Sequence, residues 1–555
     1  MRRDDRHQAD GAGAAAGEPA PLAWHGAIGL MCLALSVPLA LYDTLPLLDY
    51  PSHLGRMRVL VADEGDVLRR IWTPDWSLIP NLALDLCVPL LARAMPLETA
   101  MRLFAGLALL LPPLGVVALS RVVFRRRSWW PLVAFIIAYD GTMLAGFLNF
   151  RVGVGLALLL AAAQLALRRR GFGWRLGLAA ISVLPLYFCH LTALALHLAI
   201  VGAVEAEANW RERWLRLGGW LALAPLVIVP LVLLRLKPAT EEAANAGLFG
   251  GVWTLLTNPL ERLRNLATAF LSYDPFVDLM AVALVVVPLA VAWRRGCLAR
   301  APGLWLLALG LFVAFPLAPM ALLGGTWVDR RVALFAVLVL IAATDPLAAF
   351  GPARRWLIAA GVGLGLVRVA LVGAVWADFA AGDLRDLERV TAAIEPEARV
   401  LVVRARPRGH PAHIWWQPRA WQIMVDVDAT IHWPALALIR RGAFLPLLHT
   451  GRGRQPLAVR ASYGCLARPD GQPPHWPALT RLSPADLEAA PYLADWPVRF
   501  DYVLLLQAGE VADGDRLLPE LLAPVAASRI AAVYRVRPAD GGVRLDCLGQ
   551  PRAAR

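Results

Sequence analysis

Charged residues are scarce in this chain, and lysine is nearly absent. Only 17% of the 555 residues are charged, against about 25% in ordinary soluble domains. Lys237 is the single lysine, and there are six cysteines in all. These shortages exclude a disordered or disulfide-dense protein, and they argue strongly against a soluble enzyme.

The sequence also lacks the short motifs of common soluble enzymes. It contains no GxSxG, no GxxxxGK[ST] and no strand-linked GxGxxG, and no cysteine spacing that indicates zinc. Its net charge of +13 comes from short arginine clusters that lie between apolar runs. Such clusters are typical of membrane topology rather than of a nucleic-acid surface, so we expect no nucleic-acid partner.

Apolar residues make up 58% of the chain, and the mean hydropathy is +0.55. A run of about 20 apolar residues crosses a bilayer. We expect an α-helical polytopic membrane protein with about eleven transmembrane helices, at 23–42, 102–121, 129–148, 152–167, 175–188, 190–206, 217–236, 276–293, 303–324, 331–349 and 355–376.

Arginine clusters predict the orientation, because they accumulate on the cytoplasmic side. All six clusters fall on one side if the N-terminus is cytoplasmic; they are Arg2, Arg3 and Arg6; Arg125–Arg127; Arg168–Arg170; Arg211, Arg213 and Arg216; Arg294, Arg295 and Arg300; and Arg354 and Arg355. Eleven spans then leave the C-terminus outside. We expect a multi-pass protein of a bacterial-type inner membrane, with a periplasmic C-terminus.

This topology predicts three parts. They are a cytoplasmic N-terminal segment (1–22), a transmembrane domain (23–377) with long external loops at 43–101 and 237–275, and an external tail (378–555). In the tail, a helix over 384–394 and strands near 399–403, 501–506 and 530–535 predict a small α/β domain. Cys465 and Cys547 share this tail, where a disulfide is one alternative.

The first external loop begins with the most informative stretch of the sequence, Asp49-Tyr-Pro-Ser-His53, followed by Arg56. We expect Ser52 to cap a helix that starts near His53, which leaves Asp49 held at the membrane surface. A general base or a ligand for Mg²⁺ or Mn²⁺ needs such a carboxylate. An ordinary polar connection is the alternative. The stretch 53–71 predicts a helix in the membrane interface, and Asn81–Pro96 is left open as a re-entrant piece.

Polar residues in or near the spans form a second group of candidates. Asp140 lies within the third span, His190 lies at the outer turn between the fifth and sixth spans, and His197 lies two turns deeper. Such residues are expensive in lipid and are often functional, although each can simply satisfy a neighbour in the helix bundle.

External basic residues are candidates for binding a phosphate. Arg330 and Arg331 stand at the outer end of the tenth span, and Lys237 stands at the start of the second external loop. The forked guanidinium group suits a lipid phosphate. The alternative is that these side chains extend to the lipid headgroups.

The whole arrangement resembles the GT-C class of integral-membrane glycosyltransferases. The resemblance rests on the cytoplasmic N-terminus, the first loop with Asp49-Tyr-Pro-Ser-His-Leu54, about eleven spans and the external tail. It implies that Asp49 is the catalytic base or a metal ligand, with His53 beside it, and that the donor is a polyprenyl-phosphate sugar. Arg330, Arg331, Lys237 and Arg56 are then candidates for the donor phosphate.

Three functions remain open from the sequence. The first is a membrane glycosyltransferase that acts on a glycan, lipid or protein acceptor at the external face. The second is a transporter or flippase of a lipid-linked glycan, with Asp140, His190 and His197 along its path. The third is a non-catalytic assembly subunit. Polar residues gather near the outer ends of the spans, which favours chemistry at the external surface.

Overall fold

The computed structural model describes residues 18–212, 217–237, 256, 258–322, 325–405, 429–451, 453–469, 471–510, 519–537, 544 and 546–550. The chain divides into two compact units. The helical unit comprises Met1–Leu41, Phe104–Leu236 and Glu241–Val372; the loop–tail unit comprises Tyr42–Leu103, Lys237–Thr240 and Gly373–Arg555. The predicted first external loop and the tail therefore fold together in one unit, although they are separate segments of the sequence.

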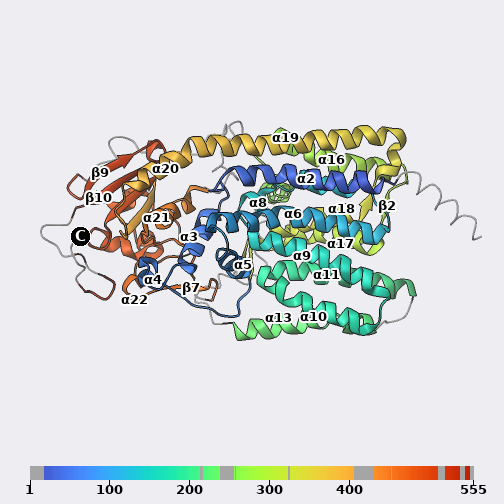
Figure 1. The fold of residues 1–555 in the computed structure, drawn as a ribbon, viewed down its shortest axis with the longest axis horizontal. Helices are drawn as coiled ribbons and strands as arrows, with labels where there is room; N and C mark the ends of the chain where they lie inside the picture. The colour runs from blue at the N-terminus through green and yellow to red at the C-terminus, as the bar shows by residue number, and fades with distance from the viewer. Residues whose placement is uncertain are drawn as a thin grey trace, which may run out of the picture. The chain divides into compact units, whose positions relative to one another are not determined.

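Eight helices in the described part of the chain are long and apolar enough to cross a membrane. They are α2 (Pro21–Leu41), α6 (Leu97–Phe124), α9 (Leu148–Ala166), α10 (Phe172–Cys189), α11 (Leu191–Glu212), the consecutive α12 (Leu217–Leu221) and α13 (Pro225–Leu236), α16 (Pro275–Arg294) and α19 (Arg354–Ala381) (Figure 1). The prediction of a mainly helical chain with apolar spans is confirmed.

Three of the eleven predicted spans coincide with shorter helices. The third is broken into η1 (Trp130–Leu132), α7 (Val133–Ile136) and α8 (Gly141–Leu144), and the ninth and tenth correspond to α17 (Pro302–Ala314) and α18 (Val328–Ala342). Asp140 causes the break before α8, because its carboxylate accepts hydrogen bonds from the amides of Thr142 and Met143 and so caps a new helix. The count of eleven spans stays a prediction.

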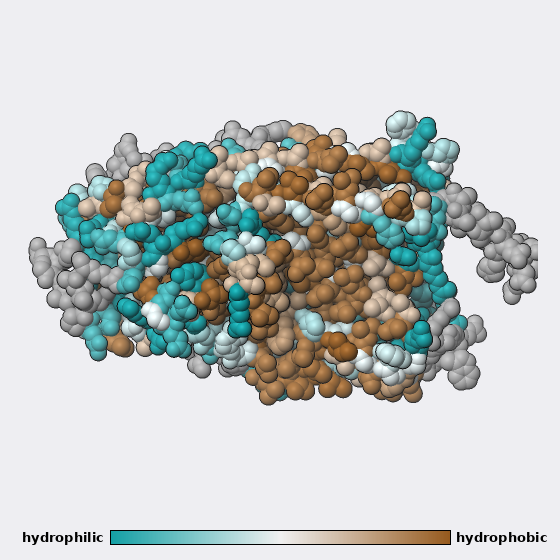
Figure 2. Space-filling model, in the orientation of Figure 1, coloured by the Kyte–Doolittle hydropathy of each residue, from teal (hydrophilic) through white to brown (hydrophobic). Residues whose placement is uncertain are grey.

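Small residues let helices of the helical unit approach closely. A Cβ atom at Gly115 of α6 would lie 2.6 Å from Cβ of Leu158 on α9, which is too close for a side chain. Helices in membranes pack in this way, by direct backbone approach. Leucine and isoleucine cover the outside; Leu30, Ile181 and Leu279 are 67%, 72% and 65% exposed. Figure 2 shows this hydrophobic surface over the helices. Such a surface is stable in lipid rather than in water.

A four-stranded sheet forms the centre of the tail within the loop–tail unit. Its strand order is β6 (Val400–Arg404), β8 (Tyr502–Leu506), β10 (Ala531–Val536) and β9 (Leu522–Ala527). β6 and β8 are parallel, and the other pairs are antiparallel. Helix α20 (Asp383–Ala392) precedes the sheet. The predicted tail helix and its three predicted strands are confirmed, and β9 is an addition.

The first loop is bound to the tail by backbone pairing and by helix packing. Strand β1 (Trp72–Pro74) pairs antiparallel with β7 (Leu457–Val459). Helix α3 (Tyr50–Leu60) packs on α21 (Ala435–Arg441), where Gly55 lies against Ala435 and Leu438. Most of α3 is therefore buried. The single helix expected over 53–71 is divided into α3 and α4 (Val67–Ile71), and its place in the membrane interface stays a prediction. The tail covers the face that the sequence left unpartnered.

A disulfide joins Cys465 and Cys547 in the tail, with their Cα atoms 5.6 Å apart. It connects the region after α22 (Ala461–Gly464) to the segment near the C-terminal end. Cys32, Cys87, Cys189 and Cys297 are free thiols. Of the predicted second external loop, 238–255 and 257 lie outside the described residues, and α15 (Pro259–Ala267) follows them in the helical unit.

Candidate functional site

Asp49 is the N-cap residue of α3 and makes no side-chain capping hydrogen bond. The helix starts at Tyr50, earlier than expected, so the prediction that Ser52 caps it is wrong. Pro51 fits the first turn of a helix, where its missing N–H is not needed. Tyr50 is fully buried, and its hydroxyl lies 3.5 Å from the carbonyl oxygen of Asp43.

The Asp49 carboxylate lies beside an imidazole that comes from the tail. Nε2 of His432, at the end of η6 (Ala429–His432), is 3.4 Å from Oδ1 of Asp49. The two side chains are 14% and 18% exposed, so both are shielded but remain accessible. The first loop and the tail therefore build this pair together.

Two further histidines surround the pair. The rings of His432 and His449 meet edge to face with centroids 4.6 Å apart, and the His53 ring lies 6.3 Å from that of His449. The backbone N–H of His449 donates to Oγ of Ser52 at 3.4 Å. The structure thus brings the predicted Asp49 and His53 together with two histidines that the sequence analysis did not select.

Burial keeps the imidazoles of His432 and His449 neutral at physiological pH. It lowers the pKa of His432 to about 4. Burial also lowers the pKa of His449 well below its ordinary value, and the neighbouring His432, His53 and Arg56 add to this effect. A neutral imidazole can donate one proton and accept another. Next to a carboxylate, it can orient that carboxylate or exchange a proton with it.

The prediction that Asp49 binds a metal ion stays a prediction. Among the described residues, no three or more histidine, cysteine, aspartate or glutamate side chains are placed to hold a metal ion together.

Arg56 lies close to this region, but it is engaged elsewhere. It is fully buried, and its Nε and Nη2 atoms donate to the two carboxylate oxygens of Asp85 at 2.6 and 3.2 Å. Asp85 belongs to α5 (Ala83–Leu91). A bidentate buried pair of this kind leaves little room for a phosphate, so we assign Arg56 to the packing of α3 on α5.

In the helical unit, Arg330 lies in the first turn of α18, inside a polar cluster. Its Nε atom donates to Oδ1 of Asn265 at 3.1 Å, and its guanidinium lies over the Trp327 ring at 4.2 Å. The preceding Asp329 accepts from Arg262 and Asn265, both at 2.7 Å. α15 and α18 are joined through this cluster.

Arg331 and His190 lie together. The sequence analysis proposes Arg331 for binding the donor phosphate and His190 for a transport path. Nη1 of Arg331 is 2.6 Å from Nε2 of His190. The same guanidinium contacts the rings of Phe147 and Phe150, at 4.6 and 4.7 Å from their centroids. Stacking on aromatic rings holds an arginine in one orientation, as phosphate recognition requires.

The two remaining intramembrane candidates have structural partners. Asp140 binds Arg151 in a buried ion pair and accepts from the Thr142 hydroxyl at 2.6 Å. Nδ1 of His197 lies 3.1 Å from the carbonyl oxygen of Ala157, within hydrogen-bond distance. Both residues are fully buried. Their contacts are those of groups that stabilise a helix bundle.

Lys237 follows α13 and belongs to the loop–tail unit. It is partly buried, and burial, together with the nearby Arg454, lowers its pKa. The arrangement adds no contact that identifies a phosphate site.

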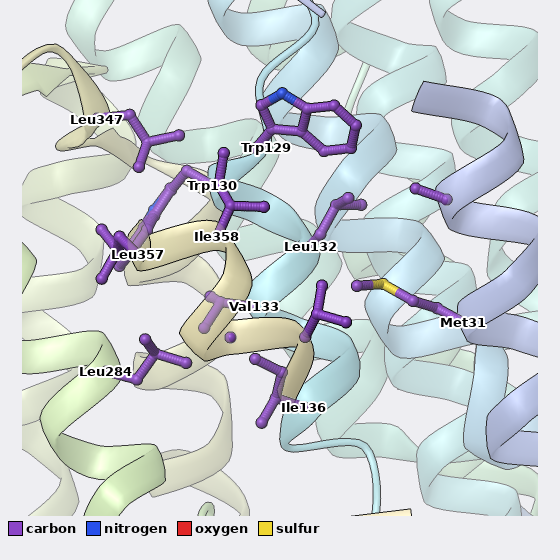
Figure 3. Close-up of a pocket in the computed structure, with 13 residues that line it drawn as sticks. Met31, Trp129, Trp130, Leu132, Val133, Ile136, Leu284, Leu347, Leu357 and Ile358 are labelled. Carbon is purple, nitrogen blue, oxygen red and sulfur yellow. The ribbon is translucent and has the colours of Figure 1, made fainter. Parts of the chain in front are cut away.

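An apolar pocket lies within the helical unit (Figure 3). It is lined by Ala27, Met31, Trp129, Trp130, Leu132, Val133, Ile136, Leu284, Leu347, Leu357, Ile358, Gly361 and Val362. This lining contains no titratable side chain. The pocket suits a hydrocarbon chain rather than a polar substrate.

Sequence reasoning missed His432 and His449, the two imidazoles that the tail brings to the Asp49 region. They stand 383 and 400 positions after Asp49, in a loop-rich part of the tail. No local spacing connects them to the first loop. Only the pairing of loop and tail reveals their role.

No family model matches this chain, and no curated protein matches it. The resemblance to GT-C enzymes thus continues to rest on the motif and the architecture.

Proposed function

We propose that this protein is a GT-C-like membrane glycosyltransferase that transfers a sugar from a polyprenyl-phosphate donor to an acceptor at the membrane surface. The observation that carries this proposal is the Asp49–His432 pair, a shielded carboxylate with a neutral imidazole 3.4 Å away. Asp49 lies only eight residues after the end of α2, a candidate membrane span. Such a carboxylate can accept a proton close to the membrane.

The proposed reaction uses Asp49 as a general base. An acceptor hydroxyl loses its proton to Asp49 while its oxygen forms a bond to the anomeric carbon of the donor sugar. The bond from that carbon to the phosphate oxygen breaks, and polyprenyl phosphate leaves. His432 orients the carboxylate, and the proton passes from Asp49 to solvent in the next step.

We assign the donor phosphate to Arg330 and Arg331 because of their chemistry. Both are held by stacking on aromatic rings, and guanidinium groups bind phosphate in a bidentate manner. Arg56 is left out of this assignment because Asp85 holds it. No observation favours the transporter alternative, since Asp140 and His197 have the structural contacts described above.

The test is the turnover of a lipid-linked sugar by membranes that carry Asp49→Asn at matched expression. This change keeps the size of the side chain but removes its basicity, so turnover should fall by about 100-fold or more. Asp43→Asn is the matched control, because Asp43 is exposed and binds Arg102 at 3.2 Å. Near-normal turnover by Asp49→Asn would show that Asp49 is not the catalytic base and belongs to an ordinary polar connecting segment.

We also propose a bacterial inner membrane as the location, with a cytoplasmic N-terminus and a periplasmic tail. The Cys465–Cys547 disulfide supports it, because disulfides persist in oxidising compartments. Reporter fusions after Arg127 and after Asp378 should report opposite sides of the membrane. Reporters on the same side would contradict this topology.

A further inference from the structure

The apolar pocket of the helical unit opens towards the outside of the helix bundle. Its floor comes from the broken third span, where Trp130, Val133 and Ile136 are buried. Its walls come mainly from α2, α16 and α19 (Figure 3), and Val362 on α19 is 44% exposed. About 540 Å³ of space lies inside, counting the open mouth, which is a size typical of ligand pockets.

Arginines stand at one end of this pocket. Helix α19 begins with Arg354 and Arg355, and its later residues Leu357, Ile358 and Val362 line the pocket. Residues three and four positions apart share a helix face, so Arg354 lies on the same face as Leu357 and Ile358. Val362 lies about 12 Å further along the helix axis than Arg354. The pocket therefore runs from a basic edge into the apolar bundle, as an acyl chain runs from its phosphate.

Acidic residues balance only part of the charge at this end. Arg126 and Arg127 pair with Asp345 and Glu18 at 2.8 and 3.0 Å. Within the described part of the chain, the guanidinium of Arg355 contacts the neighbouring tryptophan ring, 5.3 Å from its centroid, rather than a carboxylate. Arg355 is also exposed. An anionic group at the mouth of the pocket therefore meets a positive charge.

One residue of the lining carries a hydrogen-bond donor that is unused within the described part of the chain. Nε1 of Trp130 is buried, and no atom of the described residues accepts a hydrogen bond from it. Buried N–H groups in native proteins nearly always have a partner. Trp130 stands three positions after Arg127, close to the basic edge. The ester carbonyl of a glycerolipid is an acceptor that lies between the phosphate and the acyl chain, at the level of this indole.

We propose that this pocket binds an anionic phospholipid of the leaflet next to these arginines. One acyl chain fills the space between α2, α16 and α19, an ester carbonyl accepts from Trp130, and the phosphate lies at Arg354 and Arg355. Basic pockets between membrane helices bind lipid headgroups in this way. The proposed donor-phosphate contact is elsewhere: Arg330 is in the first turn of α18, whereas Leu347 of the pocket follows the other end of that helix, about 20 Å further on. The lipid site does not rest on the transferase assignment.

Two glycines of α19 supply a matched pair of variants. A Cβ atom at Gly361 would lie 3.5 Å from Cδ1 of Ile136 and 3.6 Å from Cδ2 of Leu284, which are ordinary contacts. All three residues line the pocket, so Gly361→Leu places its larger side chain in the space for the acyl chain. At Gly363, nothing lies within 4 Å of that position, so Gly363→Leu adds the same side chain outside the pocket. Both variants gain the same helix propensity.

The probe is phosphatidylglycerol with a diazirine on its acyl chain, photolysed in phosphatidylcholine proteoliposomes that carry the full-length protein. Phosphatidylcholine with the same diazirine is the neutral comparison. Mass spectrometry of the peptides should place the phosphatidylglycerol crosslinks on 129–136 and 357–362. Gly361→Leu should remove most of this labelling, because its side chain occupies the site, whereas Gly363→Leu should leave it unchanged.

The arginines should determine which lipid is preferred. Arg354→Gln with Arg355→Gln should lower the preference for phosphatidylglycerol over phosphatidylcholine about 10-fold, since each basic residue near an anionic lipid contributes about fivefold. These two positions are half-exposed and exposed, so this variant decides the question even if Gly361→Leu fails to fold.

Equal labelling by the two lipids in the unaltered protein would overturn the proposal, and so would full labelling in Gly361→Leu. Loss of labelling on addition of an equimolar polyprenyl phosphate would assign the pocket to the donor chain, and would overturn it too. The experiment measures no turnover, so its failure is separate from a failure of the transferase assignment.

Discussion

Buried and half-buried carboxylates have different neighbours in the two units. In the helical unit, Asp278 and Asp329 contact Arg368 and Arg262 at 2.8 and 2.7 Å, and Asp140 contacts Arg151. In the loop–tail unit, Asp49 lies beside a histidine. An arginine keeps its charge at any physiological pH, whereas an imidazole can gain or lose a proton.

This difference separates carboxylates paired with a permanent charge from one whose neighbour can exchange a proton. Asp85, in the same unit as Asp49, follows the pattern of the helical unit because it binds Arg56. The contrast thus depends on the local partner rather than on the unit. A charged residue in a membrane protein is a functional candidate only after its partner is known.

Breaking a structural pair should have the largest effect on stability. Asp140→Asn leaves the Arg151 guanidinium buried without its counter-charge, and we expect the free energy of unfolding to fall by about 3–5 kcal/mol. The folded fraction after heating in detergent, measured by size-exclusion chromatography, reports this loss. Adding Arg151→Leu should restore part of the stability. A stable Asp140→Asn variant that fails only in transport would instead support the transporter alternative.

The histidines of the loop–tail unit should make it sensitive to acid. The folded pKa of His432 is about 4, below its ordinary value of 6.5, so the unfolded state binds more protons between these values. Stability is therefore complete above about pH 6.5 and falls as the pH drops towards 4. We expect a loss of about 2 kcal/mol from His432 between pH 7 and pH 5.

The melting temperature across this pH range measures the effect. His432→Gln should flatten the dependence, and His25→Gln, on α2 of the helical unit, is the control substitution. An equally steep dependence in His432→Gln would show that His432 is not the group that titrates.

The smallest effect is expected for the proposed phosphate contact. Arg330→Ala should raise the KM for the lipid-linked donor about 10-fold, with little change in kcat, because a contact made in both ground and transition state supports binding alone. Steady-state kinetics with varied donor concentration test it. A fall in kcat at unchanged KM would show instead that Arg330 contacts the donor only in the transition state.

Long apolar helices and the strands of the tail could be predicted from the sequence, because both follow from simple periodicity. The short helices of the third, ninth and tenth predicted spans could not, since their ends depend on local features such as the Asp140 cap. Two-residue strands such as β2 (Ala299–Arg300) and β5 (Thr344–Asp345) are also too short to leave a pattern.

Only the part of the candidate site that comes from the first loop could be predicted from the sequence. Asp49 and His53 belong to one short segment, so the sequence indicates them together. His432 and His449 reach the site through tertiary packing, and the partner of Arg56 is 29 positions away. Tertiary packing decides which charged residues form pairs, so these pairs cannot be predicted from composition or from local spacing.

Because the first loop pairs with the tail, its folding has to wait until the ribosome has synthesised the tail. The contact between Ser52 and His449 joins residues 397 positions apart, and β1 must wait for β7 in the same way. At about 5–20 residues per second, the ribosome needs roughly 20–80 s to make the intervening chain. During that interval the first loop has already emerged without its partner strand or α21. Maturation of the Asp49 region is therefore one of the last events in the synthesis of the protein, and a nascent chain cut off before the tail carries the carboxylate without the histidine beside it.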